Sequence, residues 1–181
     1  MNLLSVSENI FTLDSFLSSK EYEAFIVKAE KDGFRSADVD IGKGRSHLTH
    51  IRNNERVDWV SEELAEDWWD KLPHDLLPEI EGRKAIGLTP RFRFYRYTPG
   101  QKFNMHKDGR QEASGNTTMM TLLVYLNEGY EGGSTKFRQD DVEINAVTGQ
   151  ALIFEHHLWH QGTIIESGSK YVLRTDIVFQ C

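Results

Sequence analysis

The feature that most constrains the fold is a change in the pattern of apolar and turn residues at residue 91. From there on, short apolar runs follow one another with turn residues between them and no helix-length segment. The expected strands are residues 91–98, 117–126, 134–138, 150–155, 162–166 and 170–179. Turn signals separate them at Pro99-Gly100, Glu131-Gly132-Gly133 and Thr148-Gly149. This spacing predicts a β-barrel or a two-sheet sandwich.

Two helices are expected before this region. The first covers residues 18–33, with Ser18 and Glu21 spaced as a capping box and Gly33 at the end. The second begins at Asp58 or Ser61 and ends before Pro73. Residues 36–57 between them are polar and glycine-punctuated, which indicates strand fragments joined by a loop. The predicted fold is therefore mainly β with flanking helices (α+β), the two helices packing on one sheet.

Length and composition indicate one domain. A chain of 181 residues with 39% hydrophobic content can bury one core and is short for two. We expect residues 1–181 to form a single domain, with a helical and strand support region at 1–90 and the functional core at 91–179.

Charge and cysteine content exclude several function classes. The net charge is −7 and no run of lysine or arginine occurs, so nucleic acid and anionic membrane are poor partners. No signal peptide or membrane-spanning stretch is evident. The single cysteine, Cys181, allows no internal disulfide and no thiolate zinc site. We expect a soluble, intracellular (cytoplasmic) protein.

The run "TTMMTLLVYL" at 117–126 is apolar on both faces. Strand alternation places Met119, Thr121, Leu123 and Tyr125 on one side. A strand buried on both faces fits a sheet covered by helices outside and lining a pocket inside. Thr121 and Tyr125 are the polar groups expected to face that pocket.

The stretch "FNMHKDGR" at 103–110 suggests a metal site. His106 and Asp108 would point the same way along a strand, although alone the pair is more typical of a surface turn at Asp108-Gly109 than of a metal site. The downstream stretch "EHHLWHQG" offers His156, His157 and His160. Two histidines and one carboxylate form the facial triad of non-haem Fe(II) oxygenases. We favour His160 as the third ligand, because a new strand begins directly after it.

Two cations, Lys170 and Arg174, share one face of the last expected strand. Four strand residues span about 13 Å, so only one of the two can reach a given carboxylate. Either could be an ordinary exposed cation. If buried, each needs a bound anion or an acidic neighbour such as Asp176.

Four segments in this order resemble the Fe(II)- and 2-oxoglutarate-dependent dioxygenases, in particular their prolyl 4-hydroxylase-like branch. They are "RFRFYRYTPGQKFNMHKDG", "TLLVYLNEGYEGGSTKF", "VTGQALIFEHHLWHQG" and "SGSKYVLRTDIVF", and they span residues 91–179. The resemblance implies a double-stranded β-helix, a jelly-roll barrel, which agrees with the strand pattern.

The resemblance also implies roles for individual residues. His106, Asp108 and His160 would bind Fe(II), and Lys170 would bind the distal carboxylate of 2-oxoglutarate, with Arg174 as the alternative. Tyr125 and Tyr97 resemble tyrosines that line the cosubstrate site. The stretch "IRNNERVDW" looks like the loop beside the substrate entrance, which makes Arg52, Asn53, Asn54 and Arg56 candidate rim residues. A capped turn before the second helix explains these four equally well.

The implied reaction is hydroxylation of a C–H bond with consumption of O2 and release of succinate and carbon dioxide, with ascorbate as a supporting reductant. The Asp108 carboxylate favours hydroxylation over halogenation, because related halogenases lack it. The substrate would be a peptide, protein or small molecule, a prolyl residue being the one that the branch suggests. The oligomeric state stays open. Two alternatives remain: a cupin-like metalloprotein that does not use 2-oxoglutarate, and a non-catalytic binding module on the same fold.

Overall fold

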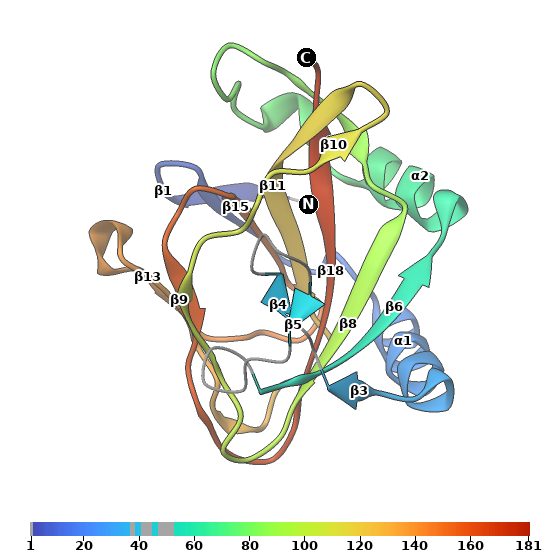
Figure 1. The fold of residues 1–181 in the computed structure, drawn as a ribbon, viewed down its shortest axis with the longest axis vertical. Helices are drawn as coiled ribbons and strands as arrows, with labels where there is room; N and C mark the ends of the chain where they lie inside the picture. Colours follow the sequence, from blue (N-terminus) through green and yellow to red (C-terminus); the bar gives the residue numbers. More distant parts are fainter. Residues whose placement is uncertain (1, 37–38, 41–44, 47–52) are drawn as a thin grey trace.

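The computed structural model describes residues 2–36, 39–40, 45–46 and 53–181 (Figure 1). Its helices are α1 (Ser19–Asp32) and α2 (Glu62–Lys71), with short 3-10 helices η1 (His74–Leu76) and η2 (Gln139–Asp141). The strands of the first half are β1 (Leu3–Ser7), β2 (Ile10–Leu13), β3 (Arg35–Ser36), β4 (Val39–Asp40), β5 (Arg45–Ser46), β6 (Glu55–Val60), β7 (Ala85–Leu88) and β8 (Arg91–Tyr97). Those of the second half are β9 (Phe103–His106), β10 (Glu112–Ala113), β11 (Asn116–Tyr125), β12 (Glu131–Gly132), β13 (Thr135–Phe137), β14 (Glu143–Ile144), β15 (Ala151–Glu155), β16 (His160–Gly162), β17 (Ile165–Ser167) and β18 (Lys170–Phe179).

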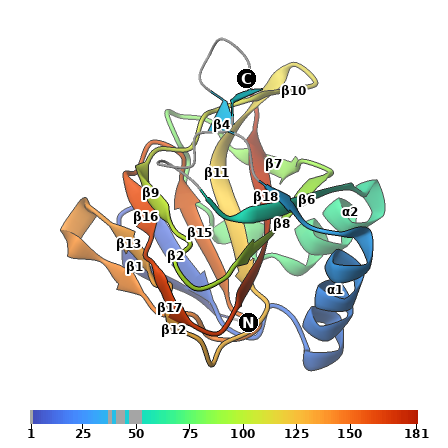
Figure 2. The ribbon, with the colours of Figure 1, turned by 60° about the horizontal axis from the view of Figure 1, so that its bottom comes forward.

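Two antiparallel sheets form the body of the molecule. The large sheet has the order β1-β2-β15-β11-β18-β8-β6-β3, with β10 added to β11 and β7 added to β18. The smaller sheet has the order β14-β13-β16-β9. In Figures 1 and 2 the smaller sheet lies across from β11, β18 and β8. Side chains from both sheets line a pocket between them. This arrangement confirms the predicted mainly β fold with two helices at one side.

Both helices lie at the predicted positions. Around α1 the capping box is formed, since the Ser18 backbone N–H donates to Glu21 Oε2 at 2.7 Å and Glu21 N donates to the Ser18 hydroxyl. Gly33 ends the helix with a positive φ of 84°, a conformation that glycine adopts without strain. Of the two candidate starts of α2, Ser61 is the N-cap, whereas Asp58 belongs to β6.

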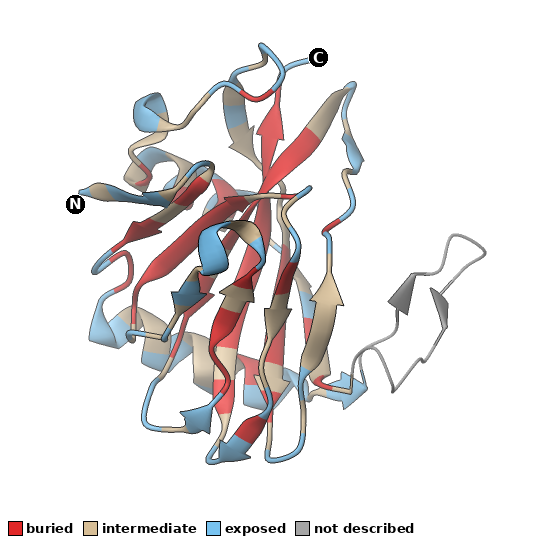
Figure 3. Ribbon diagram, turned by 90° about the vertical axis from the view of Figure 1, so that its left-hand side faces the viewer, coloured by how far each residue is buried: buried red, intermediate tan, exposed pale blue. Residues whose placement is uncertain are grey.

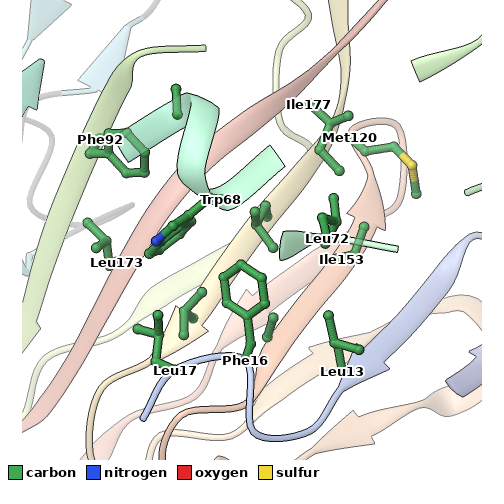
Figure 4. Packing of buried hydrophobic residues seen from close by; sticks show 14 of the residues in the cluster. Leu13, Phe16, Leu17, Trp68, Leu72, Phe92, Met120, Ile153, Leu173 and Ile177 are labelled. Atoms are coloured by element: carbon green, nitrogen blue, oxygen red, sulfur yellow. The ribbon is translucent and has the colours of Figure 1, made fainter. Parts of the chain in front are cut away.

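The helices cover the outer face of the large sheet and complete the main core (Figures 1 and 4). Trp68 of α2 is 1% exposed and packs edge-on against Phe16 and Phe92, with ring centroids 5.1 and 5.2 Å apart. Trp59 stacks on Phe94 within the same core. Figure 3 shows that burial follows the long strands, and β11 and β18 are buried along most of their length. The large sheet is therefore covered on both faces, as the apolar run at 117–126 predicts.

Two parts of the strand prediction were wrong. The run expected at 162–166 is divided between β16, which pairs with β9 and β13, and β17, which pairs with β12. The chain changes sheets between them, so one apolar run serves two partners. The N-terminal strands β1 and β2 were not predicted, although β2 adds to the large sheet beside β15. Short edge strands give too few alternating residues to be recognised alone.

Within the described part of the chain, no helix combines the length and the hydropathy needed to cross a bilayer.

Candidate metal centre and its pocket

Three potential metal ligands converge between the sheets. His106 is the last residue of β9, His160 is the first residue of β16, and the two are paired across the strands. The His106 Nε2 atom lies 3.6 Å from Asp108 Oδ1, and the His160 Nε2 atom lies 3.7 Å from Asp108 Oδ2. The ligand atoms of all three residues lie within 4.8 Å of one another. Asp108, however, lies beyond the end of β9, so strand alternation is not what brings it to the histidines.

Both histidine rings are oriented by backbone carbonyls. His106 Nδ1 lies 2.7 Å from Asn104 O, and His160 Nδ1 lies 2.9 Å from Leu158 O. A ring that donates through Nδ1 keeps the lone pair of Nε2 free for a metal. The Nε2 atom of His106 is buried and has no hydrogen-bond partner among the described residues. Such an orphaned acceptor facing a carboxylate suits a cation.

The charge states also suit a divalent cation. Burial lowers the pKa of His160 to about 4, which keeps this imidazole neutral near pH 7. Burial raises the pKa of the Asp108 carboxyl, but the Arg174 guanidinium, His160 and His106 together outweigh burial and hold this pKa well below its usual range. Neutral imidazole and ionised carboxylate are the forms that bind Fe(II) and similar ions.

Residues from both sheets line the pocket around these ligands. The lining includes the aromatic Tyr95, Tyr97, Phe103 and Phe154, the apolar Leu123 and Val172, and the polar Thr121, Thr135, Lys170 and Arg174. Phe103 stacks on the His106 ring with centroids 3.5 Å apart. The chain thus encloses the candidate metal ligands in a mostly apolar pocket that contains a few polar groups, which is the usual character of a small-molecule site.

Lys170 lies in this pocket and has no anionic partner among the described residues. Its side chain is buried, and Nζ donates to Gly133 O at 2.6 Å. The ammonium lies 5.6 Å from the centroid of the Tyr97 ring and 5.4 Å from that of Tyr125. No described carboxylate forms an ion pair with it, and burial lowers its pKa to about 8. The hydroxyl of Tyr125 lies 2.8 Å from Thr135 Oγ1 beside the same pocket.

Arg174 lies at the metal end of the pocket instead. Its Nη1 donates to Asp108 Oδ1 and its Nη2 donates to Asp176 Oδ1, both at 2.9 Å. From the sequence, each of the two cations was expected to need either a bound anion or an acidic neighbour. Arg174 has its acidic neighbours, whereas Lys170 has none among the described residues.

Several polar contacts at the site were not predicted. Thr121 was expected to face the pocket, but its 2.7 Å hydrogen bond to Asp108 Oδ2 was not foreseen. Arg93 and His156 contact Asp176 behind the metal ligands, and Thr135 lines the pocket near Lys170. Strand alternation through "RFRFYRY" gave a signal for Arg93, because it shares a face with Tyr95 and Tyr97.

The candidate rim residues have different surroundings. Arg52 lies outside the described residues. Asn53 holds a turn, since its Oδ1 accepts from Lys102 N at 2.9 Å and its Nδ2 donates to Gly100 O at 3.4 Å. Asn54 is 1% exposed, and Arg56 pairs with Asp58 at 3.2 Å. Asn53 thus supports the segment that leads to Phe103 and His106.

Comparison with known proteins agrees with this geometry. Residues 92–175 match the sequence model of the 2OG-Fe(II) oxygenase superfamily. The predicted resemblance to this superfamily is confirmed. A protein of Acanthamoeba polyphaga mimivirus named "Putative prolyl 4-hydroxylase" is 28% identical over 144 residues, which cover 68% of this chain and 57% of the viral protein. The chain therefore spans little more than half the length of this curated relative.

Solved structures of similar fold include three prolyl hydroxylases. The enzyme of Trichoplax adhaerens, in complex with a peptide fragment of hypoxia inducible factor, has a TM-score of 0.74 at 16% identity, covering 94% of this chain and 84% of that one. A prolyl-4-hydroxylase of Pseudomonas putida has a TM-score of 0.69 at 15% identity, with 93% and 92% coverage. The viral collagen prolyl hydroxylase of Paramecium Bursaria Chlorella virus-1, in its 2OG complex, has a TM-score of 0.64 at 22% identity, with 96% and 99% coverage. These likenesses show that the fold is the predicted double-stranded β-helix.

Proposed function

We propose that this chain is an Fe(II)- and 2-oxoglutarate-dependent dioxygenase that hydroxylates a C–H bond and releases succinate and carbon dioxide. The observation that carries the proposal is the pairing of two sites in one pocket. One end holds two imidazoles and an ionised carboxylate, and the other holds a buried ammonium without a carboxylate partner among the described residues. A metal ion and a dicarboxylate would complete both ends.

His106, Asp108 and His160 would hold Fe(II). The free Nε2 of His106 and the low pKa of Asp108 fit a divalent ion, and three protein ligands leave positions open for small ligands. When bound, Fe(II) with 2-oxoglutarate and O2 supplies the oxidising power for C–H hydroxylation. The presence of the Asp108 carboxylate supports hydroxylation over halogenation.

Lys170 would bind the distal carboxylate of 2-oxoglutarate. A buried ammonium is costly without an anion, and a charge-assisted hydrogen bond to a carboxylate offsets that cost. Tyr125, with Thr135 beside it, would add a hydroxyl donor, and Tyr97 would form the aromatic wall. The apolar lining from Phe103, Leu123 and Val172 would exclude water from the cosubstrate.

The substrate we propose is a prolyl residue in a peptide or protein. Support comes from the curated viral relative and from neighbours of the same fold that are named prolyl hydroxylases, one of them holding a peptide. A small-molecule substrate is the alternative. The turn held by Asn53 would shape the entrance, and ascorbate would act only as a supporting reductant.

Binding of both cofactors tests the proposal before any substrate is known. Anaerobic addition of Fe(II) and 2-oxoglutarate to the purified protein should give a visible metal-to-ligand charge-transfer band. A cupin-like metalloprotein would bind the metal but give no such band, and a non-catalytic module would give neither signal. In air, succinate should form, and mass spectrometry should find one added oxygen atom in candidate prolyl peptides. Absence of the band with metal bound would overturn the cosubstrate assignment.

We further propose that residues 1–90 support a core at 91–179 within one domain, since β6 and β3 extend the large sheet and both helices cover it. A reducing, intracellular compartment is also proposed, because the 181 residues contain one cysteine. Localisation of a tagged protein outside the cytoplasm would contradict the second proposal.

A further inference from the structure

We propose that Arg174, anchored by Asp176, is a positioning residue that fixes the carboxylate of Asp108 for the metal. The inference rests on the proposed function, because it takes Asp108 as a metal ligand. It assigns a role to a cluster of buried polar groups, none of which is proposed to contact the metal or the cosubstrate. The cluster consists of Arg93, His156, Arg174 and Asp176.

The first observation is that both oxygens of Asp108 receive hydrogen bonds. Arg174 Nη1 donates to Oδ1 at 2.9 Å, and Thr121 Oγ1 donates to Oδ2 at 2.7 Å. An ionised carboxylate has about four lone-pair directions, so two remain for a metal after these bonds. Held at both oxygens, the carboxylate cannot rotate away from His106 and His160.

The second observation is that Arg174 is itself held. Asp176 Oδ1 accepts from Nη2 of Arg174 at 2.9 Å and from Nε at 3.3 Å. Arg93 donates to the other oxygen of Asp176, and the His156 ring lies 3.3 Å from the first. Strand register builds this arrangement, because Arg93 is paired with Arg174 and Thr121 with Asp176.

The third observation concerns the backbone of Asp108. This residue lies beyond β9, so no strand pairing fixes it. Its N–H donates to the carbonyl of His156 at 3.0 Å, and the His156 N–H donates to Met119 O at 2.8 Å. The backbone and the side chain of the proposed ligand are therefore both attached to the same buried cluster.

Charge balance separates this role from binding of a second anion. Two buried guanidinium groups, Arg93 and Arg174, face two buried carboxylates, Asp108 and Asp176. Both terminal nitrogens of Arg174 already donate to a carboxylate. If Arg174 acted only by its charge, its removal would strengthen metal binding, because like charges repel. A positioning role predicts the opposite sign.

Metal titration without 2-oxoglutarate tests whether substitution of Arg174 weakens or strengthens metal binding. Co(II) binding is followed by its visible spectrum and Mn(II) binding by electron paramagnetic resonance, in the wild type and in Arg174→Met, Arg174→Lys and Asp176→Asn. Loss of groups that orient metal ligands typically weakens metal binding 10–100-fold, and we expect Arg174→Met to fall in that range. Arg174→Lys should recover part of the affinity, because an ammonium still donates to one carboxylate but cannot reach both as a fork. The Co(II) band shape should change in the Met variant, as ligand geometry changes.

Thr175→Val is the matched control. Thr175 is buried in the same strand, but its hydroxyl bonds to Thr89 O at 2.8 Å and is not part of the cluster. This variant should bind metal like the wild type. Circular dichroism checks folding. If Arg174→Met does not fold, Arg174→Lys decides the question, because it keeps the charge and a charge-only role predicts no change in its metal affinity.

The outcomes are distinct. A wild type that binds neither Co(II) nor Mn(II) contradicts the proposed function itself. A wild type that binds metal, with equal or tighter binding in folded Arg174 and Asp176 variants, overturns only the positioning role. Weaker binding in these variants, with normal binding in Thr175→Val, supports it.

Discussion

Two buried cations on the same face of β18, Lys170 and Arg174, have opposite surroundings. Arg174 is bonded to two carboxylates, one of them a proposed metal ligand. Lys170 has one carbonyl and two aromatic rings around its ammonium, and no described carboxylate. Burial alone disfavours both charges, yet the pKa of Arg174 is raised above its usual value by Asp108 and Asp176, whereas that of Lys170 is lowered to about 8.

The charge of Arg174 is balanced by carboxylates of the protein, whereas the charge of Lys170 needs a bound anion. A buried charge without a partner costs folding free energy, and proteins keep such groups chiefly at functional sites. Substitution of Arg174 is therefore expected to lower the stability of the fold. Substitution of Lys170 is expected to raise the stability and to weaken cosubstrate binding. The following predictions test that contrast, beginning with the largest effect.

Asp108→Ala should abolish metal binding and succinate formation. The change removes the one carboxylate of the ligand group and also leaves Arg174 with Asp176 alone. Co(II) titration and a succinate assay measure the loss. Asp75→Ala is the control, since the Asp75 side chain is 96% exposed and should be neutral. Turnover retained by the Asp108 variant would contradict the metal centre.

Arg174→Met should destabilise the protein by about 3 kcal/mol or more, because removal of one partner from a buried ion pair leaves the other uncompensated. Asp176 keeps Arg93, which limits the loss. Urea unfolding of the metal-free protein measures it. A loss of stability below about 1 kcal/mol would show that the ion pairs of Arg174 do not stabilise the fold.

Lys170→Met should act in the opposite direction on stability. A pKa lowered from 10.5 to about 8 implies that the charged lysine costs the metal-free fold roughly 3 kcal/mol at pH 7. Loss of the hydrogen bond to Gly133 offsets part of this, so we expect a gain of about 1–2 kcal/mol. The same variant should need more than about tenfold more 2-oxoglutarate, since a charge-assisted bond is lost, while Co(II) still binds. Unchanged 2-oxoglutarate dependence would move the cosubstrate site away from Lys170.

The fold was predictable where alternation and turns were strong. The capping box at Ser18 and the doubly buried run at 117–126 each specify one structure by local rules, and both were confirmed. The N-terminal β2 and the division between β16 and β17 depend on which strand lies alongside, which a local pattern does not contain. Nothing in residues 162–166 marks the change of sheet.

The site was predictable as a set of ligand types but not as a network. The sequence offered His106, Asp108 and His160 in order, and the structure brings them together. It did not reveal that His156 would turn to Asp176 while its carbonyl holds Asp108, because that contact depends on a loop beyond β9. Spacing along a strand identified both cations. Only the packed structure shows that Arg174 contacts two carboxylates and that Lys170 contacts none among the described residues.

Affinity for 2-oxoglutarate should fall with rising pH through the titration of Lys170. The free protein holds Lys170 protonated below its pKa of about 8, and only the ammonium attracts a carboxylate. Burial raises the pKa of the neighbouring Tyr125 and Tyr130 above the usual value, so neither phenol ionises in this range. Apparent affinity should therefore be nearly constant from pH 6 to 7 and about tenfold weaker at pH 9. The same titration on Lys170→Met should show no such decline, and an equal decline in both proteins would assign the pH effect to another group.

Tyr125→Phe should have the smallest effect. It tests whether the Tyr125 hydroxyl helps Lys170 to bind the distal carboxylate of 2-oxoglutarate. The substitution removes only the hydroxyl, which lies 2.8 Å from Thr135 Oγ1, and keeps the ring that lies beside the ammonium. Loss of one neutral hydrogen bond is worth about 1 kcal/mol, so 2-oxoglutarate affinity should fall about fivefold, with metal binding unchanged. A matched Thr135→Val variant separates the two hydroxyls: a similar loss in both indicates that they bind the carboxylate as a pair. If neither variant affects 2-oxoglutarate affinity while Lys170→Met does, the ammonium alone accounts for recognition of the distal carboxylate.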